Sequence, residues 1–316
     1  MRRLAHRLAT FAIASVIVTV IAAIIGGTAA SAQTADVWDR VENRYADNDG
    51  VRVHYVTLGE GPLVVLIHGF PDFWYLWRDY LEALSTDHQV VAIDQRWYNL
   101  SDKPKGVENY SFNFLTGDVA AVIADTGQSS ATIVGHDWGG YVAWTFAMRR
   151  PEMTDQLVIF NLPHPRGLQR ELAHSREQKD NGEYASNFQM EGAHLAMTAE
   201  GLADRHAADP VVHQRYTEAF QNSDIEAMLN YYKANYPRPP YVEDDNPLVK
   251  VRSPVLQFHG MDDPYLLYGG LNDTWEWVAQ DLTLVTIPEA GHWAVAEQSD
   301  FTIPMLKSWL SLQEKR

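Results

Sequence analysis

Short apolar runs alternate with segments of helical length along most of the chain. Between most of the runs lie polar-apolar segments long enough for helices, such as Asn113 to Thr126 and Tyr141 to Arg150. Strands that are apolar on both faces and alternate with helices predict a mostly parallel sheet covered by helices on both faces. The runs that predict strands are Val51 to Leu58, Leu63 to Ile67, Val90 to Asp94, Ala131 to Gly135, Gln156 to Phe160, Pro254 to Gly260 and Leu282 to Pro288. The first of these runs, Val51 to Leu58, follows a predicted hairpin turn at Asp49-Gly50.

One long segment interrupts this alternation. Residues 162–246 contain amphipathic helical patterns but no convincing strand, and they end in the proline-rich word "YPRPPYVEDDNP". We therefore predict a helical insertion, a lid (cap) over the carboxyl ends of the core strands. The expected organisation is a core domain in two parts, residues 33–161 and 247–316, with the lid at 162–246.

The N-terminus does not fit the core pattern. Three arginines within the first seven residues precede an apolar stretch from Phe11 to about Gly27, and small residues follow around Ala32. This order predicts a signal peptide over residues 1–32, and hence an exported protein, periplasmic or secreted, without stable membrane association after cleavage. The stretch is intermediate in length between a signal core and a membrane span, so a retained membrane anchor is the alternative.

Composition narrows the function classes. The 316 residues are 46% hydrophobic and carry a formal net charge of -16, and removing residues 1–32, with three Arg and no acid, gives -16 - 3 = -19. An acidic surface repels phosphate backbones, so nucleic acid is an unsuitable partner. The chain has no cysteine and no HExxH word, which argues against a metal site. A cofactor-free enzyme, as a monomer or homodimer, fits best.

The word "IVGHDWGGYVAW" carries the first candidate for chemistry. A predicted strand runs into Asp137, flanked by Gly135 and Gly139, and a helix follows. This is the setting of the G-x-S-x-G nucleophile elbow, with aspartate in place of serine. The glycines permit a sharp, strained turn, and the helix start directs N–H groups at the carboxylate. The alternative is an aspartate that only caps a helix.

The partners that a nucleophile needs follow in the expected order. Asp262 and Asp263 come after the penultimate predicted strand, and His292 comes after the last one. Nucleophile, acid and then histidine is the order found in hydrolases built on such elbows. The sequence alone leaves the choice between Asp262 and Asp263 open.

An early turn offers the remaining parts of a site. In "LIHGFPDFW" the N–H of Phe70 could pair with that of Trp138 to form an oxyanion hole. We expect His68 and Pro71 to shape this turn at the border of the substrate pocket rather than to react, with a cis bond before Pro71.

From about Val51 to Leu312 the chain resembles the α/β-hydrolase fold superfamily, and specifically its epoxide hydrolase family. The words that carry the resemblance are "HGFPDFWYLWR", "DQRWYNLSDKP", "GHDWGG", "NLPHP", "MDDPYL" and "GHW". The resemblance implies an aspartate nucleophile, a histidine oriented by an acid, and two lid tyrosines that hold the epoxide oxygen. The family pattern around the acid selects Asp263 and leaves Asp262 as a solvated loop residue.

The resemblance also locates the two tyrosines. In the family the first stands four residues before a Phe-Gln pair, which here gives Tyr184 before Phe188. The second lies in an Asn-aromatic-Tyr-basic word, which gives Tyr232, with Tyr231 on the other side of its helix. For each tyrosine alone, core packing is an equal alternative.

One departure from the family concerns the loop "DQRWYNLSD". Trp97 stands where the family usually has glycine, and Asn99 where it often does. Trp97 therefore either narrows the pocket or signals a loop that bends differently. Together with Phe73, Trp74 and Trp138 it suggests an aromatic surround and a small apolar substrate.

The chemistry explains why an aspartate suits such a site. A serine attacking the carbon of an epoxide or alkyl halide would form an ether that cannot be hydrolysed, whereas Asp137 forms an ester. The leading hypothesis is epoxide opening to a vicinal diol, with water activated by His292 and Asp263. The alternative is a haloalkane or haloacid dehalogenase with the same triad. A non-catalytic binding module is less favoured, and an ordinary esterase is weaker still because the elbow lacks serine.

Overall fold

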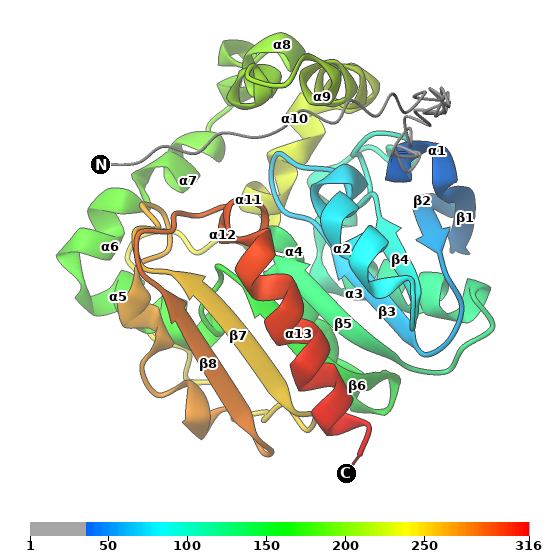
Figure 1. Ribbon diagram of the computed structural model, residues 1–316. Helices are drawn as coiled ribbons and strands as arrows, with labels where there is room; N and C mark the ends of the chain where they lie inside the picture. The colour runs from blue at the N-terminus through cyan, green and yellow to red at the C-terminus, as the bar shows by residue number, and fades with distance from the viewer. Residues whose placement is uncertain (1–35, 316) are drawn as a thin grey trace, which may run out of the picture. The chain divides into compact units, whose positions relative to one another are not determined.

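A computed structural model of the chain describes residues 36–315. Its eight strands form one sheet in the order β1-β2-β4-β3-β5-β6-β7-β8 (Figure 1). The β1–β2 and β2–β4 pairs are antiparallel, and all later pairs are parallel. The strands are β1 (Glu42–Asn48), β2 (Val51–Leu58), β3 (Leu63–Ile67), β4 (Gln89–Ile93), β5 (Ala131–His136), β6 (Thr154–Phe160), β7 (Val255–Gly260) and β8 (Leu282–Ile287).

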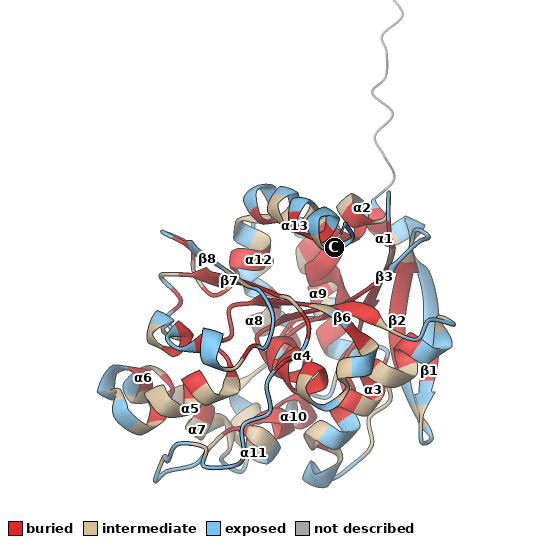
Figure 2. Ribbon diagram, turned by 90° about the horizontal axis from the view of Figure 1, so that it is seen from below, coloured by how far each residue is buried: buried red, intermediate tan, exposed pale blue. Residues whose placement is uncertain are grey.

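Helices cover both faces of the sheet because its inner strands are apolar on both sides. In β3, Val64 and Leu66 pack into one core cluster while Val65 and Ile67 pack into the other. The first cluster lies under α2 and α13, and the second under α3 and α4; Figure 2 shows the strands buried between these layers. The covering helices are α1 (Val37–Arg40), η1 (Trp74–Trp77), α2 (Arg78–Leu84), α3 (Phe112–Asp125), α4 (Trp138–Arg149), α12 (Ala294–Glu297) and α13 (Ser299–Gln313).

Between β6 and β7 the chain is helical and forms the lid. Figure 1 shows these helices at the edge of the sheet where the parallel strands end. They are α5 (Pro165–His174), α6 (Arg176–Asn181), α7 (Glu183–Phe188), η4 (Ala193–Ala196), α8 (Ala199–Ala203), η5 (Asp204–His206), α9 (Pro210–Asn222), α10 (Ile225–Met228) and α11 (Asn230–Asn235). The predicted fold class, a mostly parallel sheet with helices on both faces and a helical insertion, is confirmed.

The first strand and the turn after it can be compared with the prediction from the sequence. The strand β1 was not predicted, because it is a largely exposed polar edge strand with little apolar signal. The hairpin turn that joins it to β2 is confirmed, with φ of 53° at Asp49 and 85° at Gly50. The remaining short helices are η2 (Val107–Tyr110), η3 (Pro151–Met153), η6 (Tyr268–Leu271) and η7 (Thr274–Glu276).

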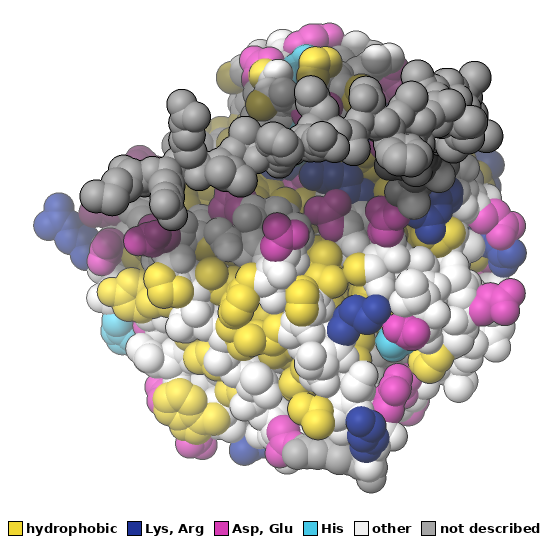
Figure 3. Space-filling model, viewed as in Figure 1, with side chains coloured by type: hydrophobic (Ala, Val, Ile, Leu, Met, Phe, Trp, Pro, Cys, Tyr) yellow, Lys and Arg dark blue, Asp and Glu magenta, His cyan; other side chains and the backbone are white. Residues whose placement is uncertain are grey.

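The predicted signal peptide, residues 1–32, lies outside the described residues. Within residues 36–315 no helix combines the length and hydropathy that a bilayer crossing requires. On the face seen in Figure 3, acidic side chains are interspersed with basic and hydrophobic ones rather than gathered in one patch.

Candidate active site

Asp137 stands at the elbow between β5 and α4 with a φ of 53°, a left-handed conformation that costs energy in a residue with a side chain. The turn is tight: a Cβ at Gly135 would collide with the backbone of Gly139, and one at Gly139 would collide with the carbonyl of Ile67. The Asp137 side chain does not cap α4. The alternative that Asp137 only caps α4 is therefore wrong.

The early turn reaches this carboxylate, as expected. The backbone N–H of Phe70 donates to Oδ1 of Asp137 at 2.8 Å, and the peptide bond between Phe70 and Pro71 is cis, which confirms that prediction. Trp138 is the first residue of α4, so its N–H belongs to the first helical turn, where amides lack intrahelical acceptors. Both predicted oxyanion donors therefore flank Asp137.

His292 lies between two carboxylates. Its Nε2 is 3.5 Å from Oδ2 of Asp137, and its Nδ1 is 2.8 Å from Oδ2 of Asp263. Asp262, the other candidate, is exposed. The structure thus places Asp263, and not its neighbour, against the histidine.

Asp263 is fixed by hydrogen bonds from its own loop and from Asn161, the residue that follows β6. Its Oδ1 accepts the backbone N–H groups of Tyr265 at 2.8 Å and Leu266 at 3.0 Å. Its Oδ2 accepts Nδ2 of Asn161 at 2.9 Å, and Asn161 also donates to the carbonyl of Gly291. Asn161 is a positioning residue that the sequence interpretation missed, although it opens the quoted word "NLPHP".

The charges of this cluster shift its pKa values. Burial alone would lower the pKa of His292, but the charge of Asp263 and the hydrogen bonds to Asp137 and Asp263 outweigh it and raise the pKa to about 10. Burial opposes ionisation of Asp263, yet the His292 charge and hydrogen bonds from His292 and Asn161 lower its pKa to about 2. In the resting protein at neutral pH, His292 is therefore an imidazolium beside the ionised Asp263.

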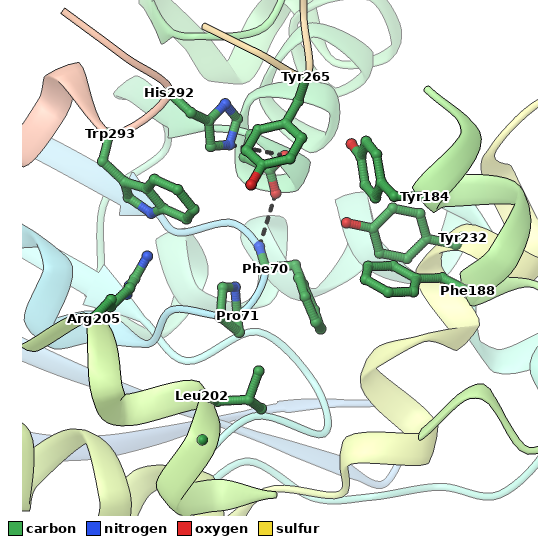
Figure 4. A pocket seen from close by; sticks show the side chains of 12 residues that line it. Phe70, Pro71, Tyr184, Phe188, Leu202, Arg205, Tyr232, Tyr265, His292 and Trp293 are labelled. Atoms are coloured by element: carbon green, nitrogen blue, oxygen red, sulfur yellow. Dashed lines mark hydrogen bonds and ion pairs between the residues drawn. The ribbon is translucent and has the colours of Figure 1, made fainter. Parts of the chain in front are cut away.

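Asp137 lines a cavity of about 340 Å³. Figure 4 shows the other side chains around this cavity, among them His292, Tyr184 and Tyr232. Tyr184, on α7, and Tyr232, on α11, line the same cavity with ring centroids 6.1 Å apart. Burial raises the pKa of both phenols well above its ordinary value, so both keep their protons. Tyr231 faces elsewhere and donates to the carbonyl of Arg96 at 3.4 Å.

The Phe-Gln pair that marked Tyr184 has a physical role. The ring of Phe188 packs 5.5 Å from that of Tyr184 and 5.1 Å from that of Tyr232, and it also contacts Phe70. The Nε2 of Gln189 donates to the carbonyl of Tyr232 at 3.0 Å. The pair therefore ties α7 to α11 and sets the spacing of the two hydroxyl groups.

The rest of the cavity wall mixes predicted and unpredicted residues. Pro71 lines it, as expected. The lining residues that the sequence interpretation did not assign are Phe188, Gly201, Leu202, Arg205, Tyr265 and Trp293. Tyr265 and Trp293 lie beside Asp263 and His292 in the quoted words, which was an available signal; Leu202 and Arg205 lie on lid helices, where one sequence gives none.

Trp97 does not line the cavity, so its assignment to the substrate pocket was wrong. Its φ is 72°, and that of Asn99 is 42°. The backbone of this loop thus keeps a conformation that favours glycine, and the Trp97 ring turns inward, 1% exposed, to stack on Tyr110 with centroids 3.5 Å apart. Trp97 leaves the pocket untouched.

Three further predicted neighbours are also structural. His68 is buried, with Nδ1 2.9 Å from the carbonyl of Gly69 and Nε2 accepting the N–H of Gln95 at 3.0 Å, and it does not line the cavity. Phe73 and Trp74 belong to the core cluster on the other face of the sheet, which α2 and α13 cover. The aromatic side chains of the cavity come instead from the lid and from the loops after β3, β7 and β8.

Within residues 36–315 no group of three or more histidine, aspartate or glutamate side chains is arranged to hold a metal ion. The arrangement can do acid-base and nucleophilic chemistry: a strained carboxylate, a histidine–acid pair beside it, and two protonated phenols face one cavity.

The chain is similar in sequence and in fold to known proteins. The family model described as alpha/beta hydrolase fold matches residues 62–299. Epoxide hydrolase 1 of Caenorhabditis elegans is 32% identical over 293 residues, which cover 87% of this chain and 70% of that protein. The AB hydrolase superfamily protein YfhM of Bacillus subtilis is 32% identical over 296 residues, 87% of this chain and 100% of that protein. The crystal structure of Bacillus megaterium epoxide hydrolase in complex with an inhibitor is 31% identical, with a TM-score of 0.78, covering 85% of this chain and 100% of that one.

Proposed function

This chain belongs to the epoxide hydrolase family of the α/β-hydrolase fold, and we propose that it converts epoxides to vicinal diols through a covalent ester on Asp137. The observation that carries the proposal is the meeting of Asp137, the His292–Asp263 pair and two buried lid tyrosines in one cavity. Each part supplies one step of the reaction.

In the first step a carboxylate oxygen of Asp137 attacks a ring carbon of the epoxide and the carbon–oxygen bond breaks. The ring oxygen takes a proton from Tyr184 or Tyr232, which gives a hydroxyalkyl ester and a phenolate. Because both tyrosines remain protonated and line the cavity, they can donate as the ring opens. An unaided alkoxide would be a poor leaving group.

Loss of the Asp137 charge then lowers the pKa of His292. The hydrogen bond and the charge of Asp137 are among the causes that raise the His292 pKa, so esterification lowers it and the imidazolium gives up its proton, which restores the phenol. Neutral His292 is now able to act as a base. Asp263 remains ionised and keeps the ring oriented.

In the second step His292 takes a proton from water, whose oxygen attacks the Cγ of Asp137. The N–H groups of Phe70 and Trp138 stabilise the oxyanion of the tetrahedral intermediate. The intermediate collapses, and the leaving alkoxide takes the proton of the newly added hydroxyl group. The diol departs, Asp137 is again a carboxylate and His292 again an imidazolium, so the proton count closes.

The dehalogenase alternative is less well supported. A leaving halide needs N–H donors around it but no proton. Trp138, the donor that could serve, does not line the cavity; its ring packs edge-on against Tyr232 with centroids 5.0 Å apart. Two protonated phenols, by contrast, suit an oxygen leaving group.

Oxygen-18 labelling tests the covalent route. In a single turnover with excess enzyme in labelled water, the label should enter the carboxylate of Asp137, and the diol should carry the unlabelled oxygen that Asp137 supplied. Digestion and mass spectrometry of the Asp137 peptide read out the result. Label found in the diol alone would mean direct attack of water on the epoxide, and the ester route would be wrong.

Export also belongs to the proposal, since residues 1–32 have the order of a signal peptide. N-terminal sequencing of protein recovered from the periplasm or medium should begin at Gln33. Recovery of the intact chain in the membrane fraction would favour the anchor.

A further inference from the structure

Arg205 has no part in the reaction proposed above, yet it lines the cavity. Among the described lining residues it is the only basic side chain besides His292. It comes from η5 of the lid, and Figure 4 shows its tip between Trp293 and Pro71, on the other side of the cavity from Tyr184 and Tyr232. A guanidinium in so apolar a wall requires an explanation.

The guanidinium is held in place from several sides. Its Nη2 forms an ion pair with Oδ1 of Asp72, and its Nε contacts Nε2 of His206 at 3.0 Å. Its Cζ lies over the rings of Trp293 and Tyr216, 4.6 Å and 5.4 Å from their centroids. Such a group loses little further entropy when it binds a ligand.

Asp72 is dedicated to this arrangement. It is fully buried, and besides Arg205 it accepts the hydroxyl group of Tyr216 at 2.9 Å and the indole N–H of Trp293 at 3.0 Å. Burial would raise its pKa, but the charge of Arg205 lowers it below the ordinary value. Asp72 is thus ionised, and it cancels the charge of Arg205.

One nitrogen of Arg205 still has donors to offer. Within residues 36–315 Nη2 is turned to Asp72 and Nε to His206, with the Tyr216 hydroxyl group also in hydrogen-bonding contact with the guanidinium; Nη1 is the nitrogen engaged by neither Asp72 nor His206, and the side chain keeps 24% of its surface exposed. A guanidinium carries five N–H donors in a fixed plane. An acceptor on a bound molecule would therefore find oriented N–H groups in a wall that is otherwise largely apolar.

The charge balance decides which acceptor fits. Asp72 already neutralises Arg205, and the Asp137–His292–Asp263 cluster in the same cavity carries two negative charges and one positive. A carboxylate on the ligand would gain little from Arg205 and would be repelled by the cluster. A neutral oxygen acceptor gains the hydrogen bond without the repulsion.

We propose that Arg205 is a specificity-determining residue that binds a neutral acceptor oxygen, an ether or ester oxygen, on the part of the epoxide substrate remote from the ring. This inference rests on the proposed function and narrows its substrate class. It makes the preferred epoxide an oxygen-bearing one rather than a pure hydrocarbon.

An oxygen scan tests the inference. A set of straight-chain terminal epoxides of equal length, each with one CH₂ replaced by an ether oxygen at a different position, is compared with the hydrocarbon parent and with a carboxylate-ended analogue. The wild type should prefer one oxygen position over the parent by about 10-fold in kcat/KM, the value of one hydrogen bond from a charged donor. The carboxylate should gain no such advantage.

Two variants separate binding from a merely structural role. Arg205→Met alone would leave Asp72 buried without its cation, so the Asp72→Asn, Arg205→Met double variant removes both charges together. It should lose the oxygen preference while hydrolysing the hydrocarbon parent within about 3-fold of wild type. The matched control, Asp72→Asn, keeps the guanidinium but frees its charge, and should shift preference toward the carboxylate-ended epoxide.

The outcomes distinguish the two claims. If wild type hydrolyses the whole set with equal kcat/KM, or if the double variant keeps the oxygen preference, Arg205 is only a contact between lid and core and the inference is overturned. If no epoxide in the set is hydrolysed, the proposed function fails and the inference falls with it.

Discussion

Replacing the hydroxyl groups of Tyr184 and Tyr232 should slow ring opening and nothing else. Tyr→Phe keeps the rings, whose edge contacts with Phe188 hold this side of the cavity, and removes one donor each. A hydrogen bond to a developing alkoxide contributes about 1.5 to 3 kcal/mol, so each single variant should lose roughly 10-fold to 150-fold in the rate of ester formation. The double variant should lose on the order of 10³-fold or more, since both donors proposed for the ring oxygen are then gone.

Rapid-quench single turnovers measure ester formation and ester hydrolysis separately. Only the first rate should fall, because water attack uses His292 and not the phenols. Tyr231→Phe is the matched control: it lies on the same helix, but its hydroxyl group faces the Arg96 carbonyl outside the cavity, so both rates should stay within about 3-fold of wild type. A double variant that kept full activity on epoxides would refute the role given to the lid tyrosines.

Four further outcomes are expected. Asp137→Ala should abolish diol formation from every epoxide, whereas diol release at the wild-type rate would rule out the ester. The rate of ester formation should be nearly independent of pH between about 6 and 9, because the His292 pKa of about 10 keeps that side chain protonated. The rate of ester hydrolysis should fall in acid, because esterification lowers the His292 pKa and the side chain then gains a proton. Two rates that fall together as the pH is lowered would contradict this. Asp263→Asn should slow ester hydrolysis by at least about 10²-fold and Asp262→Asn by less than about 3-fold, measured by the same quench assay, and equal effects would undo the assignment of the acid. Trp97→Gly relieves a strained φ but removes a buried ring, so urea unfolding should show a net loss of roughly 1 to 4 kcal/mol with kcat/KM little changed, and a gain in stability would show that strain dominates.

The core of the fold was predictable because burial on both faces forces continuous apolar runs. Six of the seven predicted strands, β3 to β8, lie in the parallel part of the sheet, and its inner strands β3 and β5 are buried along their whole length. The edge strand β1 escaped prediction, since one side of it meets water and its residues are mostly polar. The pattern of apolar residues therefore predicts a strand best where the strand is buried.

The site was predictable where it is built on strand ends. Asp137, Asp263 and His292 follow β5, β7 and β8, and parallel strands bring their carboxyl ends together. Leu202 and Arg205 depend on how lid helices pack, which no periodicity fixes. The error over Trp97 has a similar origin: a residue in place of glycine can keep the backbone and redirect its ring, and only the stack on Tyr110 decides where the ring goes.

The central claim is that Asp137 forms an ester which His292 resolves. The most direct test is the intact mass of the His292→Gln variant after incubation with an epoxide, beside the Asp137→Ala, His292→Gln double variant. The account predicts that the single variant gains the mass of one epoxide molecule and that the double variant gains none. A single variant that remains unmodified with every epoxide tried, or a double variant that is modified as well, would contradict it.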